Sequence, residues 1–184
     1  VFLASGFADG LKLSPERLEA AITSRSRWVI INSPSNPTGM GYSADELRAF
    51  ADVIRRHPKL MVISDDLYEH LVYDGFEFST IAGLAPDLAD QVLTLNGVSK
   101  SYCMTGWRIG FAASPVPLVK AMAKLQSQST SSPGSIAQHA AVAALNGPTG
   151  FITENNAAFA RRRAMVVAAL NAMDGVSCPA PDGA

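Results

Sequence analysis

One lysine and one arginine lie within an otherwise apolar run of small residues, LNGVSKSYCMTGWRIGFAA, at positions 95–113. Lys100 follows a predicted strand through a short Gly-Val-Ser turn, and Arg108 begins another strand-like segment. Burial at a strand end disfavours the charged ammonium form of a lysine, and the neutral amine is a nucleophile that can form a Schiff base with a carbonyl group. The planar, forked guanidinium of Arg108 suits a phosphate group.

Two other turns carry polar residues of complementary kinds. Asn36 lies in SPSNPTG, where the two prolines restrict the neighbouring backbone and hold the amide in one direction. Asp65 follows four apolar residues and a serine in the run LMVIS, so we expect it to be partly shielded at a strand end. Tyr68 lies one helical turn further on and can face the same space. Taken alone, the first segment also fits a surface turn, and Asp65 also fits a helix N-cap.

One ligand accounts for the whole set. Pyridoxal phosphate requires a lysine for its aldehyde and an acid that keeps its pyridine nitrogen protonated. It also requires donors at its phenolic oxygen and cations or amides at its phosphate. Lys100, Asp65, Asn36 with Tyr68, and Arg108 fill these roles in turn. The combination therefore predicts a pyridoxal-phosphate site.

These residues follow the strands of a predicted sheet. Apolar runs at 28–32, 60–64 and 91–95 are typical of buried strands, and each is followed by one of the polar turns. Helices are predicted at 14–25, 43–56, 115–130, 133–146 and 150–173. The alternation indicates a three-layer α/β fold with a mostly parallel sheet and helices on both faces. Ligands bind beyond the carboxyl ends of the strands in such sheets.

The connections at 95–108 and 126–135 differ from the alternating strand–helix pattern. Little room for a crossover helix remains between residues 95 and 108, so the strand at about 108–114 is expected to run antiparallel. The segment QSQSTSSPGS at 126–135 is interpreted as a helix–helix junction, with Ser132-Pro133 starting the second helix.

Composition argues against several other classes of function. The chain has 184 residues, of which 48% are hydrophobic, so it can bury a core. A formal net charge of −1 gives no electrostatic reason to expect nucleic acid or an anionic membrane as a partner. Cys103 and Cys178 form no metal-binding pattern, which fits a reducing cytoplasm, and no apolar run is long enough to span a membrane.

The segments NSPSNPTG, SDDLYEHLVYDG and SKSYCMTGWRIGFAA resemble the successive signatures of fold-type I pyridoxal-phosphate enzymes. They are most similar to the class I/II aminotransferases, and in particular to bacterial aspartate/aromatic aminotransferases. The resemblance covers essentially the whole chain. It implies transfer of an amino group between an L-amino acid, of aspartate or aromatic type, and a 2-oxo acid. It also implies a cytoplasmic homodimer with its active sites at the subunit interface.

The resemblance also assigns roles to single positions. It implies that Lys100 forms the Schiff base with the cofactor and moves the proton between substrate and cofactor. Asp65 would pair with the pyridinium nitrogen, and Asn36 and Tyr68 would hydrogen-bond the phenolic oxygen. Asn36 would also face the substrate carboxylate, and Arg108 would hold the phosphate.

Some acidic and small residues depart from the family pattern or are given no role. Gly97 occupies a position where many relatives have a phosphate-binding serine, so phosphate binding is expected to depend on Arg108 and on groups elsewhere. Asp66 replaces the usual glutamate. Asp66, Glu69 and Asp74 are expected to be solvated charges.

The resemblance further implies a fragment. The family's phosphate-cradling helix N-terminus, its ring-stacking aromatic residue and a tyrosine from the partner subunit would precede Val1. The arginine that binds the substrate carboxylate would follow Ala184. Residues 1–148 are expected to form part of the cofactor-binding large domain. Residues 149–184 would form the long interdomain helix and the start of a small domain. The isolated chain is therefore expected to be inactive.

Two alternative functions remain open. A β-eliminating lyase would use the same fold and cofactor, although the string MTGWR favours transferases. A non-catalytic, aminotransferase-like effector domain of a transcription regulator would have its DNA-binding part before Val1. Such domains usually match the TGWRIG string less well.

Overall fold

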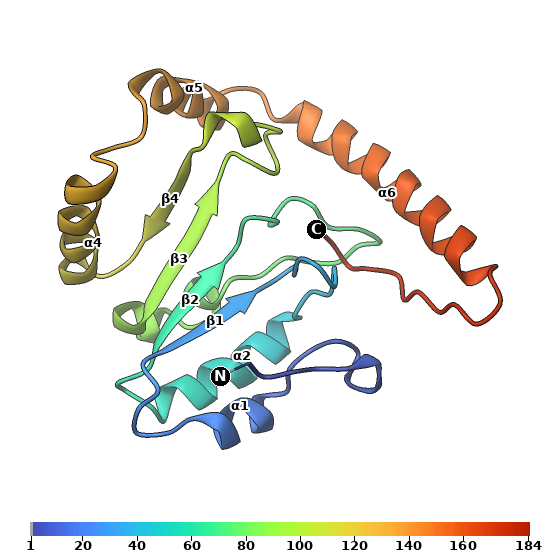
Figure 1. The fold of residues 1–184 in the computed structure, drawn as a ribbon, viewed down its shortest axis with the longest axis horizontal. Coiled ribbons are helices and arrows are strands. Elements are labelled where there is room, and N and C mark those ends of the chain that lie inside the picture. Colours follow the sequence, from blue (N-terminus) through green and yellow to red (C-terminus); the bar gives the residue numbers. More distant parts are fainter. Residues whose placement is uncertain (1) are drawn as a thin grey trace.

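A four-stranded sheet forms the centre of the fold, as described by the computed structural model for residues 2–184 (Figure 1). Its strands are β1 (Trp28–Asn32), β2 (Met61–Asp65), β3 (Val92–Gly97) and β4 (Gly110–Ala113), and they lie in the sheet in that order. β1, β2 and β3 are parallel, whereas β4 pairs antiparallel with β3. The predicted α/β class and the predicted antiparallel strand are confirmed.

Within the described residues, six α-helices connect or flank these strands: α1 (Pro15–Ala21), α2 (Ala44–Arg55), α3 (Ile81–Leu84), α4 (Val116–Ser129), α5 (Ser135–Asn146) and α6 (Gly150–Asn171). Short 3-10 turns lie at Phe7–Asp9, Pro86–Gln91 and Thr105–Trp107. Among residues 2–184, no helix combines the length and apolar character needed to cross a bilayer.

Capping residues explain where two of the helices begin. The Ser14 hydroxyl accepts a hydrogen bond from the backbone N–H of Arg17, one of the orphan donors of α1. Ser43 and Glu46 form the predicted capping box, with the Glu46 carboxylate accepting from the Ser43 N–H over 2.7 Å.

Several predicted helix boundaries differ from the observed ones, most clearly the end of α1 and the start of α5. α1 ends at Ala21 instead of 25, because Thr23 and Ser26 close a turn there. α5 begins at Ser135, so Ser132-Pro133 precede the helix that they were predicted to start.

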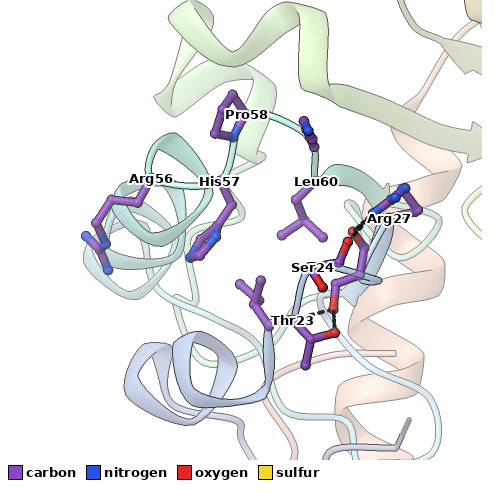
Figure 2. A pocket seen from close by; sticks show the side chains of 10 residues that line it. Thr23, Ser24, Arg27, Arg56, His57, Pro58 and Leu60 are labelled. Carbon is purple, nitrogen blue, oxygen red and sulfur yellow. Dashed lines mark hydrogen bonds between the residues drawn. The ribbon is translucent and has the colours of Figure 1, made fainter.

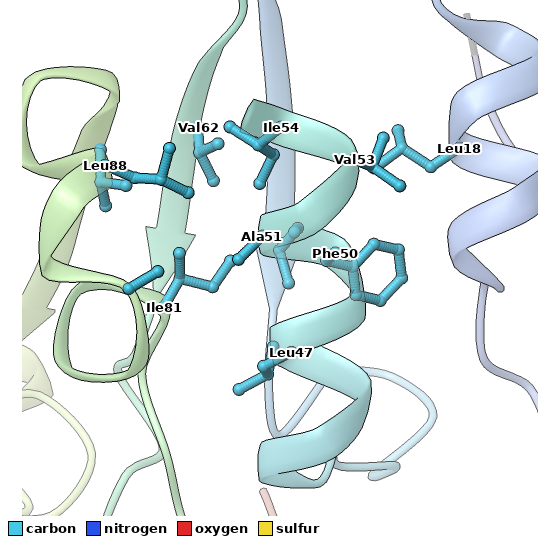
Figure 3. Packing of buried hydrophobic residues seen from close by; sticks show 12 residues of the cluster. Leu18, Leu47, Phe50, Ala51, Val53, Ile54, Val62, Ile81 and Leu88 are labelled. Carbon is cyan, nitrogen blue, oxygen red and sulfur yellow. The ribbon is translucent and has the colours of Figure 1, made fainter. Parts of the chain in front are cut away.

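The main core fills the space between α2 and one face of the sheet (Figure 3). Phe50 and Ile54 of α2 are at most 1% exposed. Burial of each such side chain contributes about 1.5–3 kcal/mol relative to leaving it in water. All three parallel strands contribute to this core, through Ile31, Val62 and Val92. The core therefore fixes α2 against the strands whose ends carry the predicted site.

Side chains alternate between the two faces of a strand, so the other face of β1 carries Trp28 and Ile30. These residues are 44% and 67% exposed. A smaller cluster of Val98, Ile109 and Ala141 joins the turn after β3 and the start of β4 to α5.

The last residues of the chain return to the sheet (Figure 1). α6 extends away from the strands for 22 residues, or about 33 Å, and the segment after it turns back. Its backbone bonds to the turns that follow β1 and β2, with Gly183 N–H donating to the Gly39 carbonyl and Ala184 N–H donating to the Leu71 carbonyl, each over 2.9 Å.

Candidate active site

The carboxyl ends of the three parallel strands meet at one edge of the sheet. Asn32, Asp65 and Leu95 are register partners across β1, β2 and β3. The Asn32 side-chain amide also donates to the Asp65 carbonyl over 3.1 Å. The turns that carry the predicted site residues therefore leave the sheet at the edge where open α/β folds bind their ligands.

Asn36 and Tyr68 come together above this edge. The Asn36 amide Nδ2 donates to the Tyr68 hydroxyl over 3.2 Å, and the Asn36 backbone N–H donates to Asn32 Oδ1 over 3.0 Å. Tyr68 lies in a run of turns after β2 and not on a helix, so the expected helical spacing is wrong. The two side chains nevertheless point to the same space.

Lys100 joins this pair. Its Nζ lies 5.3 Å from the centroid of the Tyr68 ring, within the range of a cation–π contact. The turn that carries Lys100 is closed by bonds from Cys103 N–H to the Lys100 carbonyl and from Met104 N–H to the Val98 carbonyl. Lys100 itself is half-buried. The structure thus brings together an amine, a phenol and an amide.

Asp65 is the last residue of β2 and is half-buried, as expected for a shielded strand end. It does not cap a helix, because no helix follows β2 directly. Its Oδ1 accepts from the Leu67 N–H over 3.4 Å.

Arg108 lies further out. It precedes β4, is exposed, and has a φ of 56°, in the left-handed region that non-glycine residues rarely occupy. Its guanidinium donates to the Thr105 carbonyl over 3.0 Å. Within the described residues no hydrogen bond or ion pair ties Arg108 to Lys100, Asp65, Asn36 or Tyr68.

Close packing explains the glycine at position 97. A β-carbon on Gly97 would lie 2.9 Å from the Ile109 carbonyl oxygen and 3.1 Å from the Cα of its register partner Gly110. A serine here therefore requires β4 to shift. The glycine therefore matches the close approach of the two strands at this position.

Asp66 corrects one expectation, because it is not a solvated charge. It is only 5% exposed, and the Ser64 hydroxyl donates to its Oδ1 over 2.7 Å. Burial raises the pKa of the Asp66 carboxyl, and the nearby charges of Glu69 and Asp65 act in the same direction.

Glu69 and Asp74 also make defined contacts. Glu69 is also not the solvated charge that the sequence predicts, because it is half-buried and accepts from the Asn96 side-chain amide over 2.7 Å, which ties the turn after β2 to β3. Asp74 is exposed, as expected, and forms an ion pair with Arg163 of α6.

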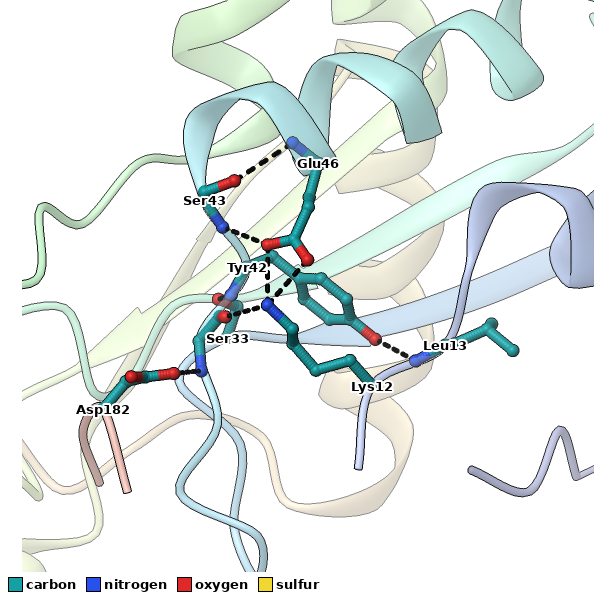
Figure 4. Close-up of polar contacts among 8 residues, drawn as sticks. Lys12, Leu13, Ser33, Tyr42, Ser43, Glu46 and Asp182 are labelled. Carbon is teal, nitrogen blue, oxygen red and sulfur yellow. Dashed lines mark hydrogen bonds and ion pairs between the residues drawn. The ribbon is translucent and has the colours of Figure 1, made fainter. Parts of the chain in front are cut away.

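Residues that the sequence did not single out hold the Asn36 turn in place (Figure 4). The Tyr42 N–H donates to Ser33 Oγ over 2.9 Å and closes the turn at its base. The Gly41 N–H donates to Asp182 Oδ2 over 2.9 Å, and Lys12 Nζ donates to the Gly41 carbonyl over 3.3 Å. Asp182 is 141 positions from Gly41, so no local pattern could have revealed this contact.

A pocket of about 370 Å³ lies at the opposite edge, where β1 and β2 begin (Figure 2). Three of its basic side chains are already hydrogen-bonded within the protein. His57 contacts Glu19 over 2.7 Å, Arg56 donates to Glu19 over 3.1 Å, and Arg27 donates to the carbonyls of Ser24 and Ser26. The pocket is therefore separate from the candidate site.

Comparisons with known proteins point to one family. Residues 5–184 match the family model for aminotransferase class I and II. The chain is 58% identical to the aspartate/prephenate aminotransferase of Cereibacter sphaeroides and 55% identical to the aspartate aminotransferase of Rhizobium meliloti. These matches cover all of this chain but only 46% and 45% of those proteins.

Solved structures show the same relationship. The crystal structure of the aspartate aminotransferase from Rhizobium meliloti superposes with a TM-score of 0.98 at 55% identity, and covers 100% of this chain and 46% of that one. The aromatic aminotransferase from Pyrococcus horikoshii gives a TM-score of 0.92 at 36% identity, over 98% of this chain and 48% of that one. The chain thus spans a little under half the length of these relatives.

Proposed function

Because the chain belongs to the class I and II aminotransferase family, we propose that it forms the cofactor-binding part of a pyridoxal-phosphate-dependent aminotransferase. The proposed reaction moves an amino group between an L-amino acid, of aspartate or aromatic type, and a 2-oxo acid. The observation that carries the proposal is the approach of Asn36, Tyr68 and Lys100 at the carboxyl edge of the sheet.

The donor set fits pyridoxal phosphate. When bound, this cofactor supplies an electron-withdrawing ring that stabilises negative charge on the α-carbon of an amino acid. Asp65 would hold the pyridine nitrogen in its protonated form. The Asn36 amide and the Tyr68 hydroxyl would donate to the phenolic oxygen, and the 3.2 Å bond between them supports a shared target. The Lys100 amine would condense with the aldehyde, whose oxygen would leave as water.

Lys100 also has the role of proton carrier in this proposal. Its Nζ would accept a proton from the substrate α-carbon and deliver one to the cofactor. A general base must lie within hydrogen-bonding reach of the proton that it takes. The half-buried setting of Lys100, against the Tyr68 ring, supports such a restricted position.

Arg108 is the proposed phosphate ligand from this part of the chain. In the described residues its guanidinium makes one hydrogen bond, to the Thr105 carbonyl, which leaves donors for an anion. Gly97 adds no side-chain ligand. The substrate carboxylate is proposed to meet the Asn36 amide.

A homodimer is proposed as the assembly. α4 and α5 expose apolar side chains beyond what isolated surface residues explain: Val116, Val119, Met122, Leu125, Ile136, Val142 and Leu145. Exposed apolar surface of this extent is typical of an interaction site.

A cytoplasmic location is proposed as well. The boundary between a large domain (1–148) and the start of a small domain (149–184) also stays a proposal, supported by the start of α6 at Gly150.

A half-reaction tests the proposed chemistry. The protein encoded by the complete gene is loaded with pyridoxal phosphate and mixed with a panel of L-amino acids in the absence of a 2-oxo acid. An aminotransferase converts the cofactor to pyridoxamine phosphate and releases an equal amount of 2-oxo acid. Release of pyruvate and ammonia without the pyridoxamine form would instead indicate a β-eliminating lyase. No reaction with any amino acid would favour the non-catalytic effector domain.

A further inference from the structure

The peptide groups on either side of Gly41 are held by two residues from distant parts of the chain (Figure 4). The Asp182 carboxylate accepts from the Gly41 N–H over 2.9 Å, and the Lys12 ammonium donates to the Gly41 carbonyl over 3.3 Å. Lys12 is itself anchored to Glu46 of the α2 capping box by a 2.6 Å ion pair. The turn at 33–42 is therefore held by hydrogen bonds from Lys12 and to Asp182, which come from opposite ends of the chain.

We propose that Asp182 is a positioning residue for the cofactor site, which holds the 33–42 turn so that Asn36 stays aligned with Tyr68. Asp182 acts through the backbone of the turn and does not touch the reacting atoms. The expected effects on catalysis rest on the proposed function. The contact between Asp182 and the 33–42 turn can be tested without cofactor.

The segment that carries Asp182 is closely fitted against the turn. Gly183 N–H donates to the Gly39 carbonyl over 2.9 Å. A β-carbon on Gly39 would lie 2.2 Å from Pro181 Cβ, and one on Gly183 would lie 2.5 Å from the Leu71 carbonyl oxygen and 2.6 Å from Pro34 Cγ. Only glycine fits at both positions, so the segment and the turn meet backbone to backbone.

The turn can transmit this contact to Asn36. Ser35 N–H donates to the Met40 carbonyl over 3.0 Å, and Gly39 N–H donates to the Ser35 carbonyl over 2.6 Å. These bonds cross the turn and join the side held by Asp182 to the residue that directly precedes Asn36. A displacement at Gly41 therefore moves Ser35 and, with it, the Asn36 side chain.

α6 holds the same segment from its other side. Arg163 donates to the Pro181 carbonyl over 2.9 Å and forms an ion pair with Asp74, and its guanidinium lies 4.9 Å from the centre of the Tyr73 ring. The position of α6 is thus connected to Asn36 through Pro181 and Asp182. Asp182 is the side chain in this connection that reaches the turn directly.

The test compares Asp182→Ala with Asp182→Asn in the protein encoded by the complete gene. The alanine variant loses the acceptor for the Gly41 N–H, whereas asparagine keeps an oxygen in the same place. Asp174→Ala, at an exposed position after α6, serves as the matched control. Two readouts are hydrogen–deuterium exchange of the 33–42 segment without cofactor and the dissociation constant for pyridoxal phosphate.

We expect Asp182→Ala to speed exchange across residues 33–42 and to weaken cofactor binding roughly 10-fold, as for loss of one charge-assisted hydrogen bond. The KM for the amino acid should rise more than kcat falls, because Asn36 is a binding group. Asp182→Asn should stay within roughly threefold of wild type, and Asp174→Ala should be unchanged. If Asp182→Ala does not fold, Asp182→Ser, whose shorter side chain does not reach the Gly41 N–H, takes its place and should give the same pattern.

Unchanged exchange in the 33–42 segment of Asp182→Ala would overturn the proposal. Equal loss of cofactor affinity in Asp182→Asn and Asp182→Ala would also overturn it, because asparagine preserves the bond. If wild type does not bind pyridoxal phosphate at all, the proposed function fails, and the exchange experiment still decides the role of Asp182.

Discussion

The amide of Asn36 donates to the hydroxyl of Tyr68 over 3.2 Å and joins two turns that follow different strands. Replacement of Tyr68 by phenylalanine removes this bond and one proposed donor to the phenolic oxygen. A net hydrogen bond contributes about 1 kcal/mol, so we expect the dissociation constant for pyridoxal phosphate to rise roughly fivefold to tenfold. Absorbance titration measures this change. Tyr102→Phe, in the cluster beside α5, is the control and should bind normally.

Lys100 should be the residue that bonds covalently to the cofactor. Borohydride reduction of the loaded protein, followed by peptide mass spectrometry, should place the added mass on the peptide that contains Lys100. Lys100→Ala should lose this labelling and at least about 10³-fold in kcat, since both the nucleophile and the proton carrier are removed. Lys120→Ala, on the exposed surface of α4, should retain both. Labelling at another lysine would contradict the assignment.

Asp65→Asn removes the negative charge at the end of β2 and keeps the size of the side chain. The amide keeps the size of the carboxylate but cannot hold the pyridine nitrogen in its protonated form. We expect kcat to fall about 10²-fold to 10³-fold, the range for removal of one preorganised electrostatic group, with little change in melting temperature. Asp90→Asn, at an exposed position before β3, controls for loss of a charge. A variant with full activity would exclude Asp65 from this role.

Asp66 should make the stability of the protein depend on pH. Burial raises its pKa in the folded state. Folding therefore favours the protonated form of Asp66. The contribution of this protonated carboxyl to stability is fully present at pH values below the pKa of Asp66 in the unfolded chain. It is lost as the pH rises through the pKa of Asp66 in the folded state. Asp66→Asn should raise the free energy of unfolding at neutral pH, because the amide is neutral and carries no cost of burying a charge.

The advantage of Asp66→Asn should disappear at pH values below the ordinary aspartate pKa of about 3.9, where wild type is also neutral. Thermal melts across the acidic and neutral range provide the measurement, with Asp174→Asn as the exposed control. An advantage that persists in acid would show that packing, and not ionisation, is responsible.

Much of the fold follows from local patterns. The β-branched run at 28–32 becomes β1 without change, and the capping box at Ser43 fixes the start of α2. β2 and β3 begin one residue later than predicted, and β4 begins two residues later. These features depend on side-chain periodicity and on groups within one turn, which the sequence displays directly.

The site was predictable in its residue types and less so in its geometry. The sequence could not show which of two adjacent aspartates faces the core, because this depends on the twist of the chain as it leaves β2. Asp66 is buried and Asp65 is half-buried. Nor could it show that Tyr68 reaches Asn36 from a turn. The contacts of Lys12 and Asp182 with Gly41 join residues far apart in the chain, and only the packed fold creates them.

The separation of 141 residues between Gly41 and Asp182 has a consequence for synthesis. The sheet order follows the chain order, so β1, β2, β3 and β4 can assemble one after another as they leave the ribosome. Asp182 is translated about 7 to 28 seconds after Gly41 at typical rates of about 5–20 residues per second. During that interval the sheet of the nascent chain can already be formed, while the 33–42 turn has its contact with Lys12 but not yet its contact with Asp182. The protein would then become able to bind cofactor only late in synthesis, after its core has folded.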